Sequence, residues 1–253
     1  MKKKSAYIIG LSIIILIFGI FTIKNFIYRD AHGKLVDPDD VSGLKKMPGK
    51  EKKENTAKKR VGYILLNGKK KKAPSFRLID QNGDTISNND YKGKVYVVEF
   101  FYTTCPTICP VMNENLKEVS KAFKGNKKFG IASFSIDPEH DTQKVLKEYA
   151  EKHDITNPNW HLLTGARDSI YDLAQKGFLL NAEEDPNEPG GILHSGMFAL
   201  IDQDGFLRSR KDDYGNPIIY YRGFIKRGAA PEVGQEKPQI DALIKDIKDL
   251  LHE

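Results

Sequence analysis

The chain contains two cysteines, Cys105 and Cys109, and both stand in the segment FFYTTCPTICPVM, residues 100–112. They are four residues apart, and each is followed by a proline. At that spacing two side chains of a helical turn point to the same side, so the sulfurs can converge. Two convergent thiolates are soft ligands that suit Cu(I) or zinc. A redox pair or a structural disulfide would need the same two residues, so the spacing alone leaves three uses open.

A metal site built on two thiolates invites a third donor, and histidine is the commonest protein metal ligand. His194 follows the loop EEDPNEPGGIL and comes directly before a predicted strand. From the end of a sheet it could reach over the cysteines, although an ordinary hydrogen-bonding role is the alternative. The other five histidines fall in chain ends or at element boundaries: His32, His140, His153, His161 and His252.

The elements on either side of the cysteines predict a strand-to-helix junction. Residues 94–102, KVYVVEFFY, are almost continuously apolar, as in a central strand buried on both faces. Pro106 favours a helix start, and Pro110 must lie within the first turn. A helix N-terminus stabilises a thiolate and lowers the pKa of a cysteine. The helix itself is predicted from apolar residues at helical spacing: Ile108, Met112, Leu116, Val119 and Phe123.

The remaining pattern alternates strands and helices. It predicts a hairpin at 76–87, a strand at 129–136, a helix at 141–153, a short strand at 161–165, a helix from Asp168, a second hairpin from 196 and a closing helix that contains residues 240–251. This order predicts an α/β fold with a mixed sheet and hairpins at both ends. With a cysteine pair after a central strand, it is the order of the thioredoxin fold.

The N-terminus predicts a membrane anchor. Residues 6–23 are eighteen residues without a charge, long enough to span the hydrocarbon layer. A cleaved signal peptide is the alternative, but no small-residue cleavage site follows. The lysines at positions 2–4 favour a cytoplasmic location for the N-terminal residues 1–5. We therefore expect a single-pass protein of the inner (cytoplasmic) membrane, whose soluble domain faces the periplasm, a compartment that permits disulfides.

A basic linker and one folded domain are expected after the anchor. The predicted linker, residues 24–72, carries much of the positive charge within the segment 45–72, although the net charge of the whole chain is only +6. Nucleic-acid binding is one interpretation of such a run, and the anchor argues against it. Attraction to anionic lipid headgroups is a secondary expectation. The domain is predicted to span residues 73–253.

Four motifs in order carry a family resemblance: YTTCPTICPVM, SFSIDPEHDT at 133–142, LTG at 163–165 and LHSGMFALIDQDG at 193–205. Together they resemble the Sco (SCO/SenC) family of membrane-anchored copper proteins needed for cytochrome c oxidase assembly. The resemblance implies a thioredoxin fold that holds one copper ion, Cu(I) or Cu(II), through Cys105, Cys109 and His194. Asp137 matches a family aspartate near the copper and is a candidate for a supporting or partner-facing role, with an exposed N-cap as the alternative.

One position departs from the family pattern. Many members have an aspartate immediately before the histidine, and this chain has Leu193. If that carboxylate orients the imidazole elsewhere, another group must do so here. Met112 and Met197 are soft donors by type, but helix and strand packing is the expected role of both.

The resemblance implies a metallochaperone rather than an enzyme, one that assists metallation of the dinuclear copper site of cytochrome c oxidase subunit II. The main alternative is a thiol–disulfide oxidoreductase that reduces that partner's cysteines, which would need the cysteines but not His194. A peroxiredoxin-like peroxidase fits poorly, because Tyr102 stands where that family has Thr or Ser. A purely structural disulfide leaves the other motifs unexplained.

Overall fold

The computed structural model describes residues 61–211, 217–230 and 236–253. The strands are β1 Val61–Tyr63, β2 Leu65–Leu66, β3 Lys69–Lys70, β4 Arg77–Asp80, β5 Thr85–Ser87, β6 Val95–Phe101, β7 Phe129–Ser135, β8 Trp160–Thr164, β9 Ala182–Glu184, β10 Ile192–His194, β11 Met197–Ile201, β12 Leu207–Lys211, β13 Pro217–Ile218 and β14 Tyr221–Arg222. The helices are α2 Cys109–Ala122, α3 Gln143–Lys152, α4 Arg167–Asp172 and α5 Ile240–Leu251, with a 3-10 turn η1 at Asn88–Tyr91 and a π-helical turn η2 at Leu173–Phe178.

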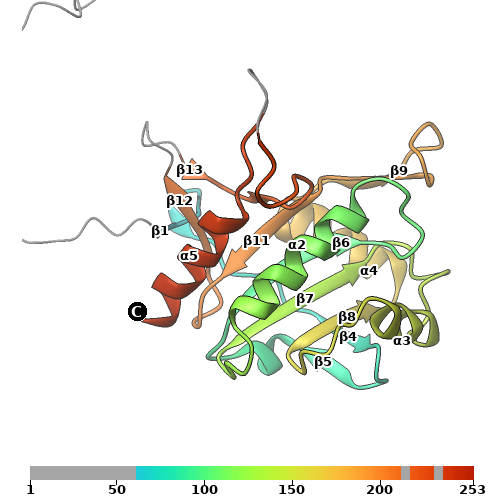
Figure 1. Ribbon diagram of the computed structural model, residues 1–253, viewed down its shortest axis with the longest axis horizontal. Helices are drawn as coiled ribbons and strands as arrows, with labels where there is room; N and C mark the ends of the chain where they lie inside the picture. Colours follow the sequence, from blue (N-terminus) through green and yellow to red (C-terminus); the bar gives the residue numbers. More distant parts are fainter. Residues whose placement is uncertain (1–60, 212–216, 231–235) are drawn as a thin grey trace, which may run out of the picture. The chain divides into compact units, whose positions relative to one another are not determined.

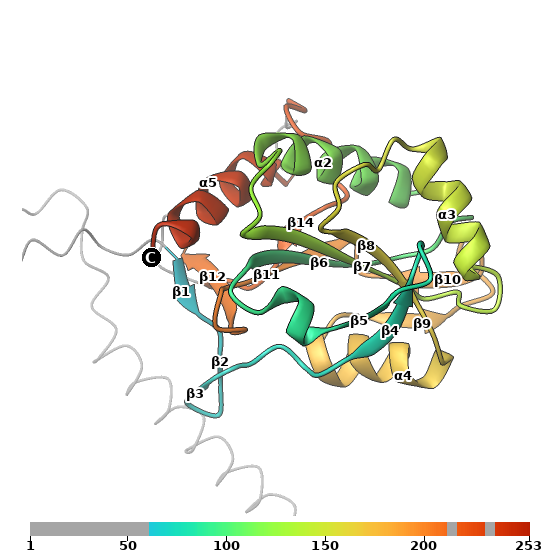
Figure 2. The same ribbon diagram turned by 90° about the horizontal axis from the view of Figure 1, so that it is seen from below.

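The main sheet is mixed, with the order β1-β12-β11-β6-β7-β8-β4-β5. β6, β7 and β8 run parallel at its centre, and β11 and β4 join them antiparallel from the two sides. Helices α2, α3 and α5 cover one face and α4 covers the other (Figures 1 and 2). The predicted α/β fold with a mixed, thioredoxin-like sheet is confirmed.

The centre of the sheet is closed to water on both faces. All seven residues of β6 and all seven of β7 are buried. Phe100 packs on Phe134 and Phe178 on the α4 side, whereas Phe101 packs on Tyr149 of α3. Apolar burial on both faces explains why these strands read as continuous apolar runs in the sequence.

The start of α2 differs from one prediction. The helix begins at Cys109, so Pro110 lies in its first turn as expected, but Pro106 precedes the helix. The prediction that Pro106 starts the helix is therefore wrong. Proline has no N–H, so a helix beginning at Pro106 would lack the hydrogen bond from residue 110 to the carbonyl of residue 106, and the Pro110 ring would clash with that carbonyl.

The N-terminal predictions meet the structure only in part. The predicted anchor at 6–23 lies outside the described residues, and within them no helix is long and apolar enough to cross a membrane. The described elements begin inside the segment 24–72 that was expected to be a linker. β1 pairs with β12, and β2 and β3 form a hairpin, so the last part of that segment belongs to the folded unit Thr56–Glu253.

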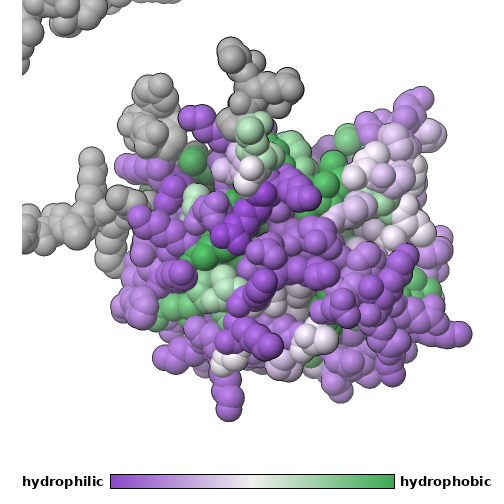
Figure 3. All heavy atoms as spheres, viewed as in Figure 1, coloured by the Kyte–Doolittle hydropathy of each residue, from purple (hydrophilic) through white to green (hydrophobic). Residues whose placement is uncertain are grey.

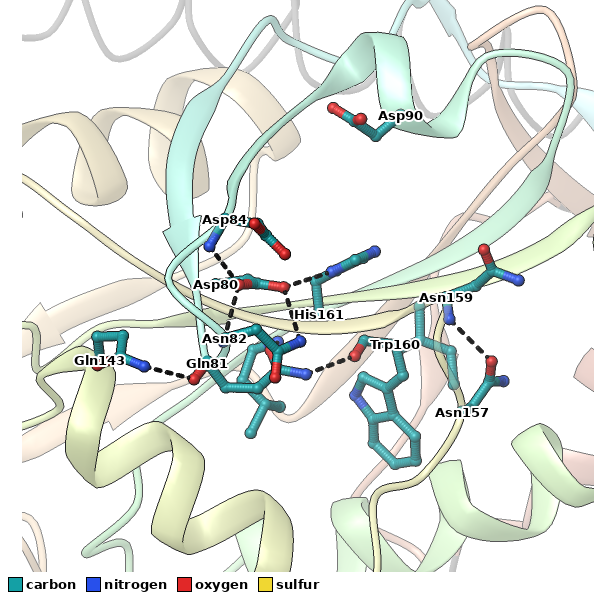
Figure 4. A network of polar contacts seen from close by, with 12 residues as sticks. Asp80, Gln81, Asn82, Asp84, Asp90, Gln143, Asn157, Asn159, Trp160 and His161 are labelled. Carbon is teal, nitrogen blue, oxygen red and sulfur yellow. Dashed lines mark hydrogen bonds and ion pairs between the residues drawn. The ribbon is translucent and has the colours of Figure 1, made fainter.

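A buried polar network ties the β4 edge to β8 (Figure 4). Asp80 accepts a hydrogen bond of 2.9 Å from His161. The Gln81 side chain donates to the carbonyl of Trp160 at 3.0 Å and accepts from the amide of Leu162 at 2.8 Å. These bonds pair buried polar groups that would otherwise be costly. His161 therefore has a structural partner, as expected of a histidine at an element boundary.

Candidate metal centre

Three donor atoms, two sulfurs and one nitrogen, converge at one buried site. The Nε2 atom of His194 lies 3.3 Å from the Sγ of Cys109 and 3.8 Å from the Sγ of Cys105. The three donor atoms lie within 4.8 Å of one another. Cys105 is 6%, Cys109 3% and His194 8% exposed. The structure thus brings together the three residues that the resemblance selected.

The two cysteines occupy different places in the junction after β6. Cys109 is the first residue of α2, whereas Cys105 lies in the preceding loop beside the exposed residues Pro106 and Thr107. The thiol of Cys109 lowers the pKa of Cys105 by hydrogen bonding, and His194 and the backbone amides of Cys109 and Thr107 act in the same direction. The helix start thus stabilises the Cys105 thiolate.

Cys109 is shifted in the opposite direction. Burial raises the pKa of Cys109, and the neighbouring Cys105 raises it further. The pair therefore combines the Cys105 thiol, which ionises readily, with the Cys109 thiol, which stays protonated until it binds a cation or is oxidised. Such asymmetry suits both soft-metal binding and thiol exchange.

A small hairpin that the sequence did not reveal holds His194. β10 pairs antiparallel with β9, and His194 faces Ala182 in the register. The sequence predicts a loop for this segment, because its charged residues and prolines hide the alternation of apolar and polar residues that marks a strand. The Tyr102 ring lies edge-on to the His194 ring with centroids 5.8 Å apart, and its hydroxyl donates to the carbonyl of Pro189 at 3.2 Å. Tyr102, at the end of β6, thereby holds the hairpin against the cysteine loop.

Two glycines permit this close approach. Gly190 has a φ of +92°, and a Cβ there would lie 2.4 Å from the Tyr102 hydroxyl and 3.0 Å from Pro106. Gly196 has a φ of +63°, and a Cβ there would lie 2.9 Å from Ile108. A side chain at either position would combine an unfavourable backbone conformation with a clash. Glycine therefore lets both sides of the His194 hairpin contact the cysteine loop.

The second ring nitrogen of His194 shows whether another group replaces the aspartate that is absent at position 193. Its Nδ1 is buried and has no hydrogen-bond partner among the described residues. The carboxylate that many family members place before this histidine is therefore not replaced by another acceptor. The ring is oriented by the hairpin and by Tyr102 instead. An outer-shell acceptor normally raises the basicity of a histidine ligand, so His194 is a weaker donor than one with such a partner.

Asp141 supports the cysteine loop from the neighbouring strand-to-helix connection. Its carboxylate accepts from the Thr103 amide at 3.0 Å, from the Thr103 hydroxyl, from Ser135 at 2.6 Å and from His140 at 2.8 Å. The carboxylate is 0% exposed. It fixes the backbone two residues before Cys105. Asp141 lies in the motif SFSIDPEHDT, but the sequence predicts no role for it, because a hydrogen bond between distant loops leaves no periodic signal.

Asp137 stands apart from the three donors. It lies in the same connection as Asp141, and its carboxylate groups with His140 and Asp141 rather than with the cysteines. Burial raises the pKa of Asp137, and the carboxylate of Asp141 adds to that shift. Its carbonyl accepts from the amides of His140 and Asp141 at 3.2 and 2.8 Å. A supporting role for Asp137 therefore stays a prediction.

The donor set fits a soft cation. Metal–sulfur and metal–imidazole bonds of about 2.3 and 2.0 Å place the sulfur and the nitrogen roughly 3.5–3.7 Å apart in tetrahedral or trigonal geometry. The observed nitrogen–sulfur separations of 3.3 and 3.8 Å lie close to that range. The shared burial also fits, because a metal would satisfy the two buried sulfurs and the Nε2 of His194. Met112 is fully buried in the core, and Met197 lies on β11.

A buried carboxyl group for which the sequence predicted no role lies on β6, the strand that leads to the cysteines. Glu99 on β6 is 3% exposed and accepts a 2.6 Å hydrogen bond from Ser133. Burial raises the pKa of Glu99 to about 7. Its carboxylate also contributes to the raised pKa of Cys109. A single glutamate inside an apolar strand was the available signal.

The chain is similar to known proteins in both sequence and structure. The curated SCO1 protein homolog of Bacillus subtilis (strain 168) is 34% identical over 132 residues, which are 51% of this chain and 68% of that protein. The crystal structure of a SCO1/SenC family lipoprotein from Bacillus anthracis str. Ames aligns with 29% identity and a TM-score of 0.58, over 71% of this chain and 94% of that one.

A second solved structure is BsSco, a member of the Sco family of cytochrome c oxidase assembly proteins, in which a disulfide switch has been identified. It aligns with 28% identity and a TM-score of 0.57, over 72% of this chain and 94% of that one. The SCO1/SenC family model matches residues 66–223, which include both cysteines and the histidine. With its mixed sheet and its Cys-Cys-His centre, the chain belongs to the SCO1/SenC family.

Proposed function

We propose that this protein is a copper metallochaperone, which binds one copper ion through Cys105, Cys109 and His194 and passes it to a partner copper protein. One observation carries the proposal: the His194 Nε2 lies within 3.8 Å of both sulfurs in a site closed to water. Thiolate and imidazole together can hold both oxidation states of copper. The partner we propose is cytochrome c oxidase subunit II, because relatives are cytochrome c oxidase assembly proteins.

The transfer would proceed by ligand exchange. Cysteines bind metal as thiolates, so loading releases protons. Cys105, with its lowered pKa, supplies the first thiolate. Its loop is bordered by the exposed residues Thr104, Pro106 and Thr107, so a partner thiolate can approach from that side. His194, whose Nδ1 has no acceptor among the described residues, is the ligand most readily released. Thiolates of the partner would then replace Cys105 and Cys109 as ligands of the ion.

The proposal is tested by copper stoichiometry and affinity of the reduced protein. Wild type is expected to bind one copper per chain. His194→Ala removes one of three ligands, and we expect its affinity to fall by about 10- to 100-fold or more, a loss at least as large as that caused by changing an outer-shell partner. His153→Ala is the matched control, because His153 caps the end of α3. Equal affinity of wild type and His194→Ala would refute the three-ligand site.

A second function, thiol–disulfide exchange with the partner's cysteines, is supported by the opposite pKa shifts of the two thiols. In that reaction the thiolate of Cys105 attacks the partner disulfide, and Cys109 then displaces the partner, leaving a Cys105–Cys109 disulfide and two partner thiols. A His194→Ala protein that loses copper binding but reduces the partner as fast as wild type would favour this role. A variant that loses both activities would favour copper delivery.

The proposed location follows from the sequence and one relative. Residues 6–23 are proposed as a single membrane anchor, with the domain on the periplasmic side of the cytoplasmic membrane. A relative in the same family is a lipoprotein. Fractionation of cells expressing the full chain, followed by protease treatment of spheroplasts, tests the proposal. Recovery in the soluble fraction, or protection from protease in intact spheroplasts, would contradict it.

A further inference from the structure

The hairpin β2–β3 presents two consecutive leucines to solvent. Leu65 is 61% and Leu66 46% exposed, and Leu65 is the most exposed large apolar side chain of the described residues. By contrast, mostly hydrophilic side chains cover the face that carries α2 and α3 (Figure 3). Single exposed leucines are ordinary, but two consecutive ones in a projecting hairpin leave both of its faces partly apolar.

Each leucine stands beside a lysine. In the register, Leu65 faces Lys70 and Leu66 faces Lys69, so both faces of the hairpin carry one apolar and one cationic side chain. Lys71 and Lys72 follow directly, and residues 61–79 contain no Asp or Glu. Lysine can keep its ammonium in the headgroup region while its stem lies along apolar neighbours. This pairing is the chemistry of a segment that lies in the surface of an anionic bilayer.

The hairpin is held rigidly on the domain. Its turn, Asn67–Gly68, has φ values of +51° and +74°, as a two-residue hairpin turn requires. The Lys71 amide donates to Ile64 at 2.9 Å, and the Lys71 carbonyl accepts from Leu207 at 2.9 Å. A preformed tip loses little conformational entropy when it docks.

Cation–π contacts hold the base of the hairpin. The Lys70 ammonium lies 3.6 Å from the centroid of Tyr63, and the Arg208 guanidinium lies 4.2 Å from the same ring. Arg208 is in turn paired with the carboxylates of Asp202 and Glu253. The Arg208 charge is therefore balanced by carboxylates within the fold, whereas the ammonium groups of Lys70 and Lys72 face only the rings of Tyr63 and Phe206 among the described residues.

The hairpin lies at the end of the sheet opposite to the metal centre. Its base joins β12 at the bridge between Lys72 and Phe206, beside the first residues of β6, whereas the cysteines follow the last residue of β6. Figure 2 shows β2 and β3 on one side of the molecule and β9 and β10 on the other. A domain that rests on this hairpin would turn its metal centre away from the surface beneath it.

We propose that the β2–β3 hairpin, with Leu65, Leu66 and Lys69–Lys72, docks on the anionic lipid surface of a membrane and orients the metal centre away from it. The segment 24–60 could span on the order of 100 Å when extended, so it would not by itself hold the domain at a bilayer. The hairpin would supply a fixed orientation of the domain on the bilayer. This inference does not depend on the metal that the centre binds.

Lysine labelling of the full chain tests the proposal. The protein is reconstituted into vesicles of equal parts phosphatidylglycerol and phosphatidylcholine, or of phosphatidylcholine alone, and acetylation of each lysine is followed by mass spectrometry. Acetylation of Lys69–Lys72 is expected to be about fivefold slower in the anionic vesicles. Lys144 and Lys176, whose side chains are 85% and 74% exposed, are internal references that should not change.

Variants separate the leucines from the charge. The double variant Leu65→Ser/Leu66→Ser is expected to lose the protection, whereas Leu179→Ser, at a site 51% exposed elsewhere, should keep it. Lys69→Glu is expected to weaken the protection without touching the apolar tip. Equal acetylation in both vesicle types would overturn the proposal. Protection that persists in the serine variant, or that appears in detergent without lipid, would also overturn it, because the hairpin would then be covered by protein.

Discussion

Glu99 is a carboxyl group within a strand whose seven residues are all buried. Its hydrogen bond from Ser133 is extended by the Trp160 indole, which donates to the Ser133 hydroxyl at 2.9 Å. Burial raises the pKa of Glu99 to about 7, and the hydrogen bond opposes this shift only in part. The side chain is thus neutral in mild acid and partly ionised at neutral pH. Ionisation places a negative charge in the interior without a cationic partner in the part of the chain that the structure describes, which costs stability.

The first prediction concerns the pH dependence of stability. The folded pKa of Glu99, about 7, lies above its ordinary value of 4.5. The folded state therefore binds the extra proton between these values, and stability from this group is complete below about pH 4.5 and is lost as the pH rises through 7. The shift corresponds to roughly 3 kcal/mol at most. Glu99→Gln keeps the acceptor for Ser133 and should remove this loss, so urea unfolding should show a variant more stable than wild type at pH 8 and similar at pH 4.5.

The control for this prediction is Glu148→Gln, whose carboxylate lies on the exposed side of α3. It should leave the pH profile of wild type unchanged. Parallel stability profiles for wild type and Glu99→Gln between pH 4.5 and 8 would contradict a buried, shifted glutamate.

At the scale of elements, the metal centre is an arrangement of two connections and one hairpin. The loop between β6 and α2 carries the thiols, the β9–β10 hairpin carries the imidazole, and Asp141 from the loop before α3 ties down Thr103. Tyr102 links the first two by its contact with His194 and its hydrogen bond to Pro189. The position of the histidine therefore depends on how firmly the hairpin is held.

The second prediction tests that link. Tyr102→Phe keeps the ring beside His194 but removes the hydroxyl that donates to Pro189. One hydrogen bond contributes about 1 kcal/mol, so fewer molecules hold the histidine in place and copper affinity should fall about fivefold. Competition titration with a copper chelator measures it. Tyr96→Phe, at the start of β6, is the matched control. Unchanged affinity in Tyr102→Phe would show that the hairpin is held by other contacts.

At the scale of the whole molecule, the donors close a long loop of chain. His194 is 85 residues from Cys109 and 89 from Cys105 in sequence. The intervening chain contains β7, α3, β8 and α4, so the site exists only when the central sheet has formed. A ligand that binds the folded state alone stabilises the entire fold by mass action.

The third prediction follows from this linkage. Copper added to the reduced protein at about 100 times its dissociation constant should raise the free energy of unfolding by about 2.7 kcal/mol, less whatever the unfolded thiols bind. At the same copper concentration His194→Ala should gain much less. Urea unfolding with and without copper measures both, and a chelator should reverse the effect. An equal gain in the variant would mean that the unfolded or partly folded thiols account for binding.

The sequence by itself determined the elements with local signals. Apolar runs and helical spacing located β6, β7, α2, α3 and α5, because burial on two faces or on one helix stripe leaves a periodic pattern. The cysteine spacing left a soft-metal site, a redox pair and a structural disulfide open, and the family resemblance singled out His194. The helix start predicted at Pro106 was wrong, since a start at Cys109, unlike one at Pro106, places Pro110 in the first turn, where its missing N–H is tolerated.

Only the tertiary structure decided what depends on pairing between distant segments. The β9–β10 hairpin, the contact of Gly190 with Tyr102 and the bonds of Asp141 to Thr103 all join parts of the chain that share no periodicity. The same holds for the Nδ1 of His194, which has no hydrogen-bond partner among the described residues. The sequence indicated this only by placing Leu193 where many family members have an aspartate. Spacing along a chain specifies which side chains share a face, but the convergence of donors depends on how whole elements pack, and that packing is a property of the fold.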